Sequence, residues 1–356
     1  MSEFENGGLA KYLAWRYECR EQEGEARQFP HGNINYPVEY AAINKYFNEQ
    51  VHPQVVALAA AHGDGLLNDH GASHVAMVIS RASILLGKNL SKLTGYEAFI
   101  LLLAIHFHDV GNVYGREGHE KRIASAISKC KLPDFLDAAV IRSVIRIAAA
   151  HGGRTMDNSK DTIAELEAEI DLSGVKIRPA LLASIVRFAD EIADDNTRVS
   201  AFASQTDAIP EKNAIYHRYS AVLQPVAISE NDLHFQFGIT LDDVAKLYDK
   251  NDTKVLLYDE ILYRMRKCYC ELIYCSRYAE GLLSGYRAIR VEVGVYCDDY
   301  IRAIYMESFR LKIGGYPEGE LSKSLHELPG ESPGCLTGDD LRRLINKEKS
   351  KNDVAK

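Results

Sequence analysis

The spacing of apolar residues predicts helices over about the first 200 positions. Within the first sixty residues, apolar side chains recur at helical intervals on both sides of a loop rich in glycine, proline and asparagine. Later helices end at glycines or begin at prolines, namely Gly87, Gly111, Pro133 and Pro179. We therefore expect positions 60 to 200 to form an all-helical block.

Beyond position 200 the pattern changes to short strands. Two strand-like segments flank the polar turn 229–232, which predicts a hairpin, and Pro225 restricts its first strand to a sheet edge. A long amphipathic helix is expected from about Asp252 to Ser284. Residues 287–296 and 300–315 then alternate apolar and polar side chains, as half-buried strands do.

These patterns predict a mainly α protein, with an all-helical bundle and an α+β C-terminal appendage. The expected parts are a helical extension (1–60), the helical domain (61–200), the appendage (201–316) and a tail (317–356). The tail is expected to be flexible or at most a short terminal helix.

Composition and charge restrict the class of protein. The chain of 356 residues is 46% hydrophobic and carries a formal net charge of −8. Its apolar runs are shorter than the roughly 20 residues of a membrane span, and the acidic amino terminus lacks a secretory pattern. Seven scattered cysteines form no CxxC pair. We therefore expect a soluble, cytoplasmic protein with no membrane partner, for which a small phosphorylated ligand suits better than a long nucleic acid.

Histidines are concentrated in the helical block, where seven of the twelve lie between positions 62 and 151. The strongest candidates for a metal site are His74, His108, Asp109, His119, His151 and Asp190. Imidazoles and carboxylates without cysteine suit Mn, Fe, Co, Ni, Mg or Zn ions, one or two of them, better than a structural zinc site. Burying the carboxylate of Asp109, which follows a very apolar helix, would be costly without a cation.

Three other histidines of this region have weaker assignments. His106 precedes His108 by two residues and points to another side of its helix, so we expect it in the core or in support of a ligand. His70 is interpreted as a rim or substrate contact, because Gly71 favours a loop there. His62 receives no role.

The segments NDHGASHVAMV, IHFHDVGNVYG and RFADEIADD resemble the HD superfamily of metal-dependent phosphohydrolases in their order, spacing and apolar settings. The resemblance covers positions 69 to 195 and implies an all-α HD fold whose ligands to one metal ion are His74, His108, Asp109 and Asp190. His119 and His151 look like the additional histidines of two-metal members, which include phosphodiesterases and dinucleotide hydrolases. Alternatively, His119 and Glu120 resemble the catalytic His/Glu of the one-metal deoxynucleotide triphosphohydrolases.

Such a site predicts hydrolysis without a protein nucleophile. Two divalent ions about 3.5 to 4 Å apart would lower the pKa of a shared water and hold it in line with phosphorus. Asp109 is the natural bridging ligand and, with His119 and Glu120, a candidate catalytic residue. Phosphate oxygens favour cationic partners. The candidates are Arg116, Lys121, Arg146, Arg154 and Arg187, each of which a solvated helix face would also explain.

The leading functional hypothesis is a metal-dependent phosphohydrolase that acts on a cyclic nucleotide, a dinucleotide or a nucleoside phosphate. One alternative is a single-strand nuclease, as in CRISPR-associated HD domains, which the acidic charge disfavours. Another is a nucleotide-sensing or partner-binding module with a regulatory HD site.

The α+β appendage bears on partners more than on chemistry. Its arrangement after the HD domain is similar to HD-type effectors of bacterial conflict and phage defence. Its tyrosine-rich and arginine-rich helix could stack bases, although ordinary packing explains the same pattern. The strand-rich half also offers an edge or a face for oligomerisation.

Overall fold

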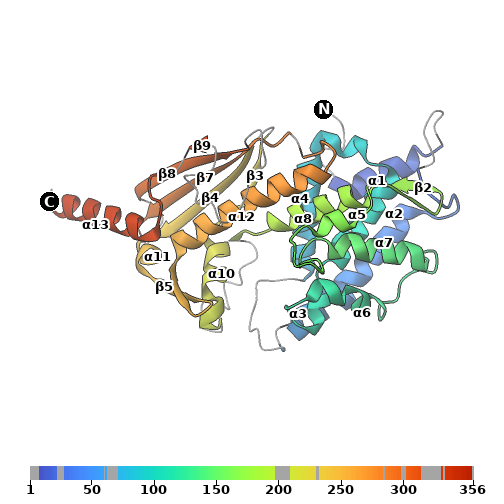
Figure 1. Ribbon diagram of the computed structural model, residues 1–356, viewed down its shortest axis with the longest axis horizontal. Coiled ribbons are helices and arrows are strands. Elements are labelled where there is room, and N and C mark those ends of the chain that lie inside the picture. Colours follow the sequence, from blue (N-terminus) through green and yellow to red (C-terminus); the bar gives the residue numbers. More distant parts are fainter. Residues whose placement is uncertain are drawn as a thin grey trace. The chain divides into compact units, whose positions relative to one another are not determined.

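The computed structural model describes residues 8–21, 28–59, 61, 71–196, 209–229, 232–283, 285–297, 302–313, 330–331 and 333–354 (Figure 1). The chain forms two compact units. Unit 1 comprises Met1–Gly65, Asp69–Ala193 and Cys275–Ser284, and unit 2 comprises Leu66–Asn68, Asp194–Tyr274 and Gly285–Lys356. The protein is mainly α, with an α+β region in the carboxyl-terminal part, as the sequence predicts.

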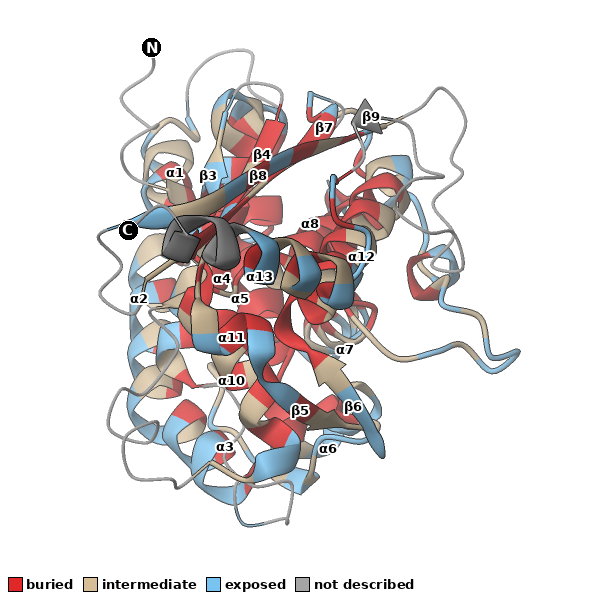
Figure 2. Cartoon of the chain, turned by 90° about the vertical axis from the view of Figure 1, so that its left-hand side faces the viewer, coloured by how far each residue is buried: buried red, intermediate tan, exposed pale blue. Residues whose placement is uncertain are grey.

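Unit 1 is a helical bundle built around α5. Its helices are α1 (Gly8–Glu18), α2 (Tyr36–Tyr46), α3 (His52–Ala59), α4 (Ala72–Leu86), α5 (Gly95–Phe107), α6 (Ile123–Ile127), α7 (Ala138–Ala149) and α8 (Pro179–Glu191). Every side chain of α5 is buried, and α1, α4, α7 and α8 pack against it. Figure 2 shows this buried centre in red. A helix made almost entirely of apolar residues, such as the run FILLLAI, is stable here because other helices surround it on all sides.

Short helical turns connect these helices. They are η1 (Phe47–Val51), η3 (Gly87–Lys92), η4 (Val110–Tyr114), η5 (His119–Arg122) and η6 (Thr162–Glu165). The predicted stop at Gly87 is confirmed, since its φ of 45° ends α4. The predicted start at Pro179 is also confirmed.

Three predictions for this unit were wrong in detail. α5 ends at Phe107, before Gly111, so the His108–Asp109 pair lies just beyond the helix. α7 begins after Asp137, whose carboxylate accepts from the amides of Ala139 and Val140, and not at Pro133. The block is also not entirely helical.

A small hairpin interrupts the predicted helical block. Strands β1 (Ile170–Leu172) and β2 (Val175–Ile177) pair antiparallel across Ser173 and Gly174. Both turn residues have positive φ, at 56° and 81°, which suits the tight turn of a two-residue hairpin. The Ser-Gly pair between the short segments IDL and VKI was the available signal for this turn.

Unit 2 contains a five-stranded sheet in the order β3-β4-β7-β8-β9. These strands are β3 (Ala227–Ile228), β4 (Asp232–Thr240), β7 (Ala288–Tyr296), β8 (Ala303–Lys312) and β9 (Gly330–Glu331). β4 and β7 run parallel, whereas the other neighbours run antiparallel. The predicted hairpin is confirmed as β3–β4, with β3 at an edge; residues 230–231 of its turn lie outside the described residues.

The segments around the sheet differ from the sequence expectation. The predicted long helix α12 runs from Leu257 to Tyr278, because β5 (Leu247–Lys250) and β6 (Thr253–Leu256) form a hairpin before it. Asn251 and Asp252 at that turn have positive φ, which asparagine and aspartate tolerate well. α10 (Glu211–Val222) and α11 (Leu241–Ala245) complete unit 2 with α13 (Gly338–Val354), which is longer than the short terminal helix expected.

The tyrosines of α12 support the packing interpretation of that helix. Tyr258 and Tyr269 are buried, and their hydroxyls donate to Glu307 at 2.7 Å and to the carbonyl of Lys312 at 3.0 Å. Tyr263 is 41% exposed, and the ammonium of Lys250 lies 4.5 Å from the centre of its ring.

In the described part of the chain, no single helix is long and apolar enough to span a membrane. Two consecutive helical segments, Gly95–Tyr114 and His119–Ile127, pass the test of length and composition when they are taken together, but the chain bends by 101° between them.

Candidate metal centre

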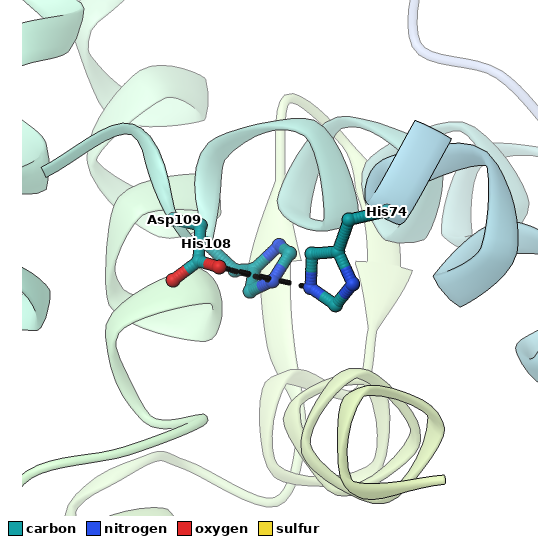
Figure 3. Close-up of side chains that lie close together, drawn as sticks. All are labelled: His74, His108 and Asp109. Atoms are coloured by element: carbon teal, nitrogen blue, oxygen red, sulfur yellow. Dashed lines mark ion pairs between the residues drawn. The ribbon is translucent and has the colours of Figure 1, made fainter. Parts of the chain in front are cut away.

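Three helices of unit 1 bring the first group of predicted ligands together. His74 lies in the first turn of α4, His108 caps the end of α5, and Asp190 lies in the last turn of α8. The Nε2 atom of His74 is 3.1 Å from Oδ1 of Asp190 and 3.6 Å from Oδ2 of Asp109. The Nε2 atom of His108 is 3.4 Å from the same Oδ2 (Figure 3). We call His74, His108, Asp109 and Asp190 set A.

A second group uses the other oxygen of the same aspartate. Oδ1 of Asp109 is 3.2 Å from Nε2 of His119, on η5, and 4.0 Å from Nε2 of His151, just after α7. We call Asp109, His119 and His151 set B. In set A, one ligand atom from each of His74, His108 and Asp109 lies close enough to the others to share an ion. The same holds for all three residues of set B.

Backbone carbonyls fix the orientation of three imidazoles. The Nδ1 atoms of His108, His119 and His151 lie 2.7, 3.0 and 2.6 Å from the carbonyl oxygens of Ile105, Arg116 and Ala148. Because a carbonyl only accepts, each Nδ1 carries a hydrogen, so Nε2 is the atom that presents a lone pair to the centre when the ring is neutral. This tautomer is the one that ligates a metal through Nε2.

Two features of this arrangement fit a bound cation. The Nε2 atoms of His119 and His151 are 3.1 Å apart, so two lone pairs face each other at a distance that a shared cation makes favourable. The buried Nε2 of His108 has no hydrogen-bond partner among the described residues. The donor set of histidines and aspartates is also one that borderline divalent ions prefer.

The electrostatics of the cluster's own side chains also fit a cation. Burial alone would lower the pKa of His108, but Asp109 and Asp190 raise it to about 10. Burial together with His108 and His119 lowers the pKa of His151 to about 3. Burial opposes the charge of Asp190, yet His108 and His74 hold its pKa well below the ordinary value. Asp109 and Asp190 therefore favour a protonated imidazole at His108. A metal ion bound at the same place would supply the positive charge instead.

Residues beside the cluster complete its rim. The side-chain amide of Asn112 donates to Oδ1 of Asp109 at 2.8 Å, and the half-exposed guanidinium of Arg116 is 3.7 Å from the same oxygen. Glu120 lies beside the ring of His119, with Oε2 3.5 Å from Nδ1. The side chain of Asp190 is 30% exposed, whereas that of Asp109 is only 6% exposed, so the cluster meets solvent on the side of Asp190 and Arg116.

Three of the other four predicted substrate contacts have partners elsewhere. Arg146 pairs with Glu167 at 2.9 Å, and Arg154 donates to the carbonyl of Asn158 at 2.7 Å. Arg187 is buried and donates to Thr162 at 3.0 Å. Lys121 is exposed on η5, two residues after His119.

Sequence reasoning missed Asn112, whose side-chain amide contacts Asp109. Asn112 follows Asp109 by three residues in an HDxxN pattern, and this spacing was the available signal.

His106 is buried, as expected, and its Nδ1 lies 3.1 Å from Nε2 of His52, on α3. Burial and the neighbouring His52 hold the pKa of His106 well below its ordinary value. His62 and His70 lie outside the described residues.

Comparison with known proteins agrees with this geometry. No curated protein and no solved structure matches the chain. A protein-family model, HD-CE, matches residues 64–257, which is more than half of the chain and includes every residue of sets A and B. The resemblance to the HD superfamily is thereby confirmed, and a metal-dependent hydrolase is consistent with both findings. This chain belongs to the HD-CE family.

Proposed function

We propose that this protein is a metal-dependent phosphohydrolase that cleaves a phosphoester of a nucleotide, either a cyclic nucleotide, a dinucleotide or a nucleoside phosphate. The observation that carries the proposal is the position of Asp109, whose two carboxylate oxygens face two different groups of histidines. A carboxylate in this position can bridge two divalent ions, which is the arrangement that in-line displacement at phosphorus uses.

Each residue of the cluster has a role in this proposal. Set A and set B would hold one divalent ion each, with Asp109 shared. Ions held there supply Lewis acidity, which lowers the pKa of water and neutralises charge on phosphoryl oxygens. The carbonyls of Ile105, Arg116 and Ala148 keep the imidazoles in the ligating tautomer. The 3.2 Å distance from His119 to Asp109 supports a ligand role for His119, and leaves Glu120 beside it as a candidate proton acceptor.

The substrate class follows from where positive charge is available. The chain carries a net charge of −8, so a polyanion gains little from its overall field. Next to the cluster, however, the exposed side chains of Arg116 and Lys121 can contact phosphate oxygens beyond those held by the ions. A small phosphorylated molecule fits this local charge better than a long nucleic acid does.

The test combines metal analysis with turnover. Purified protein would be loaded with Mn, Co, Ni, Mg or Fe ions and assayed against mono-, di-, tri- and cyclic nucleotides, alongside the variants His108→Ala and Asp109→Ala. We expect bound divalent metal and phosphate or nucleotide release in the native protein, and loss of both in the variants. His234→Ala, which removes a partly exposed histidine of unit 2, is the matched control.

Three results would overturn the proposal in different ways. Unchanged turnover in both variants would mean that the cluster does not carry the activity. Hydrolysis of single-stranded DNA alone, with log affinity falling linearly with log salt, would instead favour a nuclease. Bound metal and bound nucleotide without turnover would favour a sensing module.

A further inference from the structure

The five-stranded sheet of unit 2 has one covered face and one open face. On the covered face, the hydroxyl of Tyr258, on α12, donates to Glu307 of β8, and α12 lies along this side of the sheet (Figure 1). Alternate side chains of a strand point to the other side, where Gln236, Met306 and Ser308 are exposed. We call this side the open face. It consists of the even-numbered residues of β4, of β7 and, from Met306 on, of β8.

Basic side chains gather at one end of the open face. Arg290 of β7 lies directly opposite Arg310 of β8, where like charges repel each other. Asp232 accepts from Arg310 at 2.8 and 3.0 Å but is 3.8 Å from Arg290, whose buried Nε has no hydrogen-bond partner among the described residues. Lys312 adds a third cation here, and Glu331 of β9 lies opposite Arg310. These positions hold one more cation than carboxylates, so Arg290 is available to an anion.

Four residues further along β7, the open face carries glycines and an aromatic ring. Gly238 of β4 lies opposite Gly294 of β7, which lies opposite Met306 of β8. A Cβ added at Gly294 would lie 2.5 to 2.8 Å from ring and hydroxyl atoms of Tyr296, and that hydroxyl donates to Sδ of Met306 at 3.8 Å. Glycine therefore leaves room for the ring against the sheet. Because Tyr296 is only half-buried, its ring offers a surface on which a base can stack.

A carboxylate lies between these two ends. Gln236, Glu292 and Ser308 are side by side on the three strands, two residues from Arg290 and two from Gly294. The amide of Gln236 donates to Glu292 at 2.9 Å. Such positions are about 7 Å apart along a strand, so the two ends are about 13 Å apart. An aromatic ring, a carboxylate and a guanidinium in this order match the base, ribose and phosphates of a nucleotide, since carboxylates accept from ribose hydroxyls and guanidinium groups bind phosphate.

We propose that the open face binds one ribonucleoside triphosphate, with the base on Tyr296, a ribose hydroxyl at Glu292 and the phosphates at Arg290. A triphosphate suits the separation of about 13 Å because its charged end extends well beyond the ribose. A nucleic acid strand fits less well, because its next phosphate would meet the carboxylate of Glu292. No residue of sets A and B takes part, so the inference does not rest on the proposed function.

The test measures binding while the metal cluster is kept empty. Native full-length protein and its Asp109→Ala variant are held in EDTA and titrated with ATP by calorimetry. We expect one ATP per chain, with the same affinity in both. Arg290→Ala should weaken binding at least about tenfold, as loss of a charged hydrogen bond does. Arg343→Ala, on α13, is the matched control and should change nothing, since its guanidinium is likewise 3.8 Å from a carboxylate, that of Asp340.

The base and the ribose have separate readouts. Tyr296→Ala should weaken ATP binding about tenfold, whereas Tyr296→Phe keeps the ring and should retain it. Native protein should bind ATP about threefold to tenfold more tightly than dATP, and Glu292→Ala should remove that difference. Tripolyphosphate, which lacks base and ribose, should bind more weakly than ATP. Its binding should respond to Arg290→Ala but not to Tyr296→Ala.

Several results would overturn the inference. They are no binding of ATP in EDTA, equal losses in Arg290→Ala and Arg343→Ala, and native affinity in Tyr296→Ala. Equal affinities for ATP and tripolyphosphate would overturn it too, because the site would then hold only an anion. An RNA oligonucleotide that binds more tightly than ATP would replace the proposed ligand. If Arg290→Ala fails to fold, Arg290→Gln removes the charge, retains a long side chain and should give the same loss.

Discussion

The two units compensate their buried carboxylates in different ways. In unit 2, Asp243 is buried and pairs with Arg218, whose Nε lies 2.6 Å from Oδ1, and Asp232 is held by Arg310 at 2.8 and 3.0 Å. In unit 1, the neighbours of buried Asp109 are mainly imidazoles, whose Nε2 atoms lie 3.2 to 3.6 Å from its oxygens. Unit 2 supplies its own cations, whereas the cluster in unit 1 is arranged to receive one.

Helix α5 shows that the difference depends on the site and not only on the unit. Glu97, at its amino-terminal end, is buried and receives two contacts from Arg178, at 2.7 and 2.8 Å. Asp109 follows the other end of the helix, and imidazole nitrogens lie 3.2 to 4.0 Å from its carboxylate oxygens. Because a buried charge is costly unless it is neutralised, the arginine gives Glu97 a structural role, whereas the imidazoles around Asp109 are groups that can bind a metal ion.

The largest expected effect comes from neutralising each type of carboxylate. Asp109→Asn should lower metal-dependent turnover by about 10²- to 10³-fold or more, because the shared oxygen ligand loses its charge. Asp243→Asn should leave turnover and metal content unchanged. It should instead lower the free energy of unfolding by about 2 kcal/mol, as loss of a charged hydrogen bond does. Turnover assays and urea unfolding of both variants make the comparison, which fails if the two variants behave alike.

Added metal should stabilise the protein through unit 1. Free ion at about 100 times its Kd contributes about 2.7 kcal/mol, which corresponds to a rise of roughly 5 to 10 °C in the thermal midpoint for a unit of this size. Asp243→Asn should show the same rise from a lower starting temperature, and Asp109→Asn should show little. Thermal unfolding with and without Mn²⁺ measures this. A midpoint that is insensitive to every divalent ion would contradict the metal site.

Metal affinity in unit 1 and the stability that Asp243 contributes in unit 2 should depend on pH for different reasons. In the metal-free protein the pKa of His108 is raised to about 10, so below that pH an ion must displace a proton. Metal affinity should therefore rise as pH increases from 7 to 9, by up to about tenfold per pH unit. Calorimetry in buffers of different ionisation enthalpy would detect the released proton, and binding without proton release would contradict this account.

Asp243 provides the contrasting case for pH. Burial opposes its charge, but Arg218 and the amide of Thr240 lower its pKa below 3.8. Its contribution to stability is therefore present above that value and lost as pH falls through the lowered pKa. Urea unfolding of the native protein and Asp243→Asn at neutral and strongly acidic pH should show a difference that vanishes in acid.

The smallest effects concern the rim. Arg116→Ala should raise KM for a phosphorylated substrate by about tenfold. Arg146→Ala should change KM by less than about twofold, because a surface pair such as Arg146 and Glu167 contributes little. Steady-state kinetics on both variants distinguish a phosphate contact from a solvated arginine. Equal KM changes would remove Arg116 from the site.

Local patterns were sufficient to predict most of the helices and to single out the histidines and aspartates that the fold brings together. His74, His108 and Asp190 lie at or near the ends of strongly periodic helices, and periodicity determines which faces such helices bury. The hairpins β1–β2 and β5–β6 were missed because each strand has only three or four residues. Those strands are too short for alternation to separate them from a loop or a helix start.

Contacts between distant segments were beyond sequence reasoning. The spacing of Gly111 suggested a helix stop, whereas its actual constraint is the backbone of His119, eight residues later. Arg187 lies one turn before Asp190, which suggested a substrate contact, but its guanidinium donates to Thr162. Helical spacing gives the face on which a side chain lies, but not the partner that another segment brings to it.

The most direct test of the central claim is the anomalous scattering of crystals grown with saturating Mn²⁺. We predict two ions, both in contact with Asp109, one also held by His74, His108 and Asp190, and the other by His119 and His151. A single ion at saturation, or no ion within bonding distance of Asp109, would contradict the account.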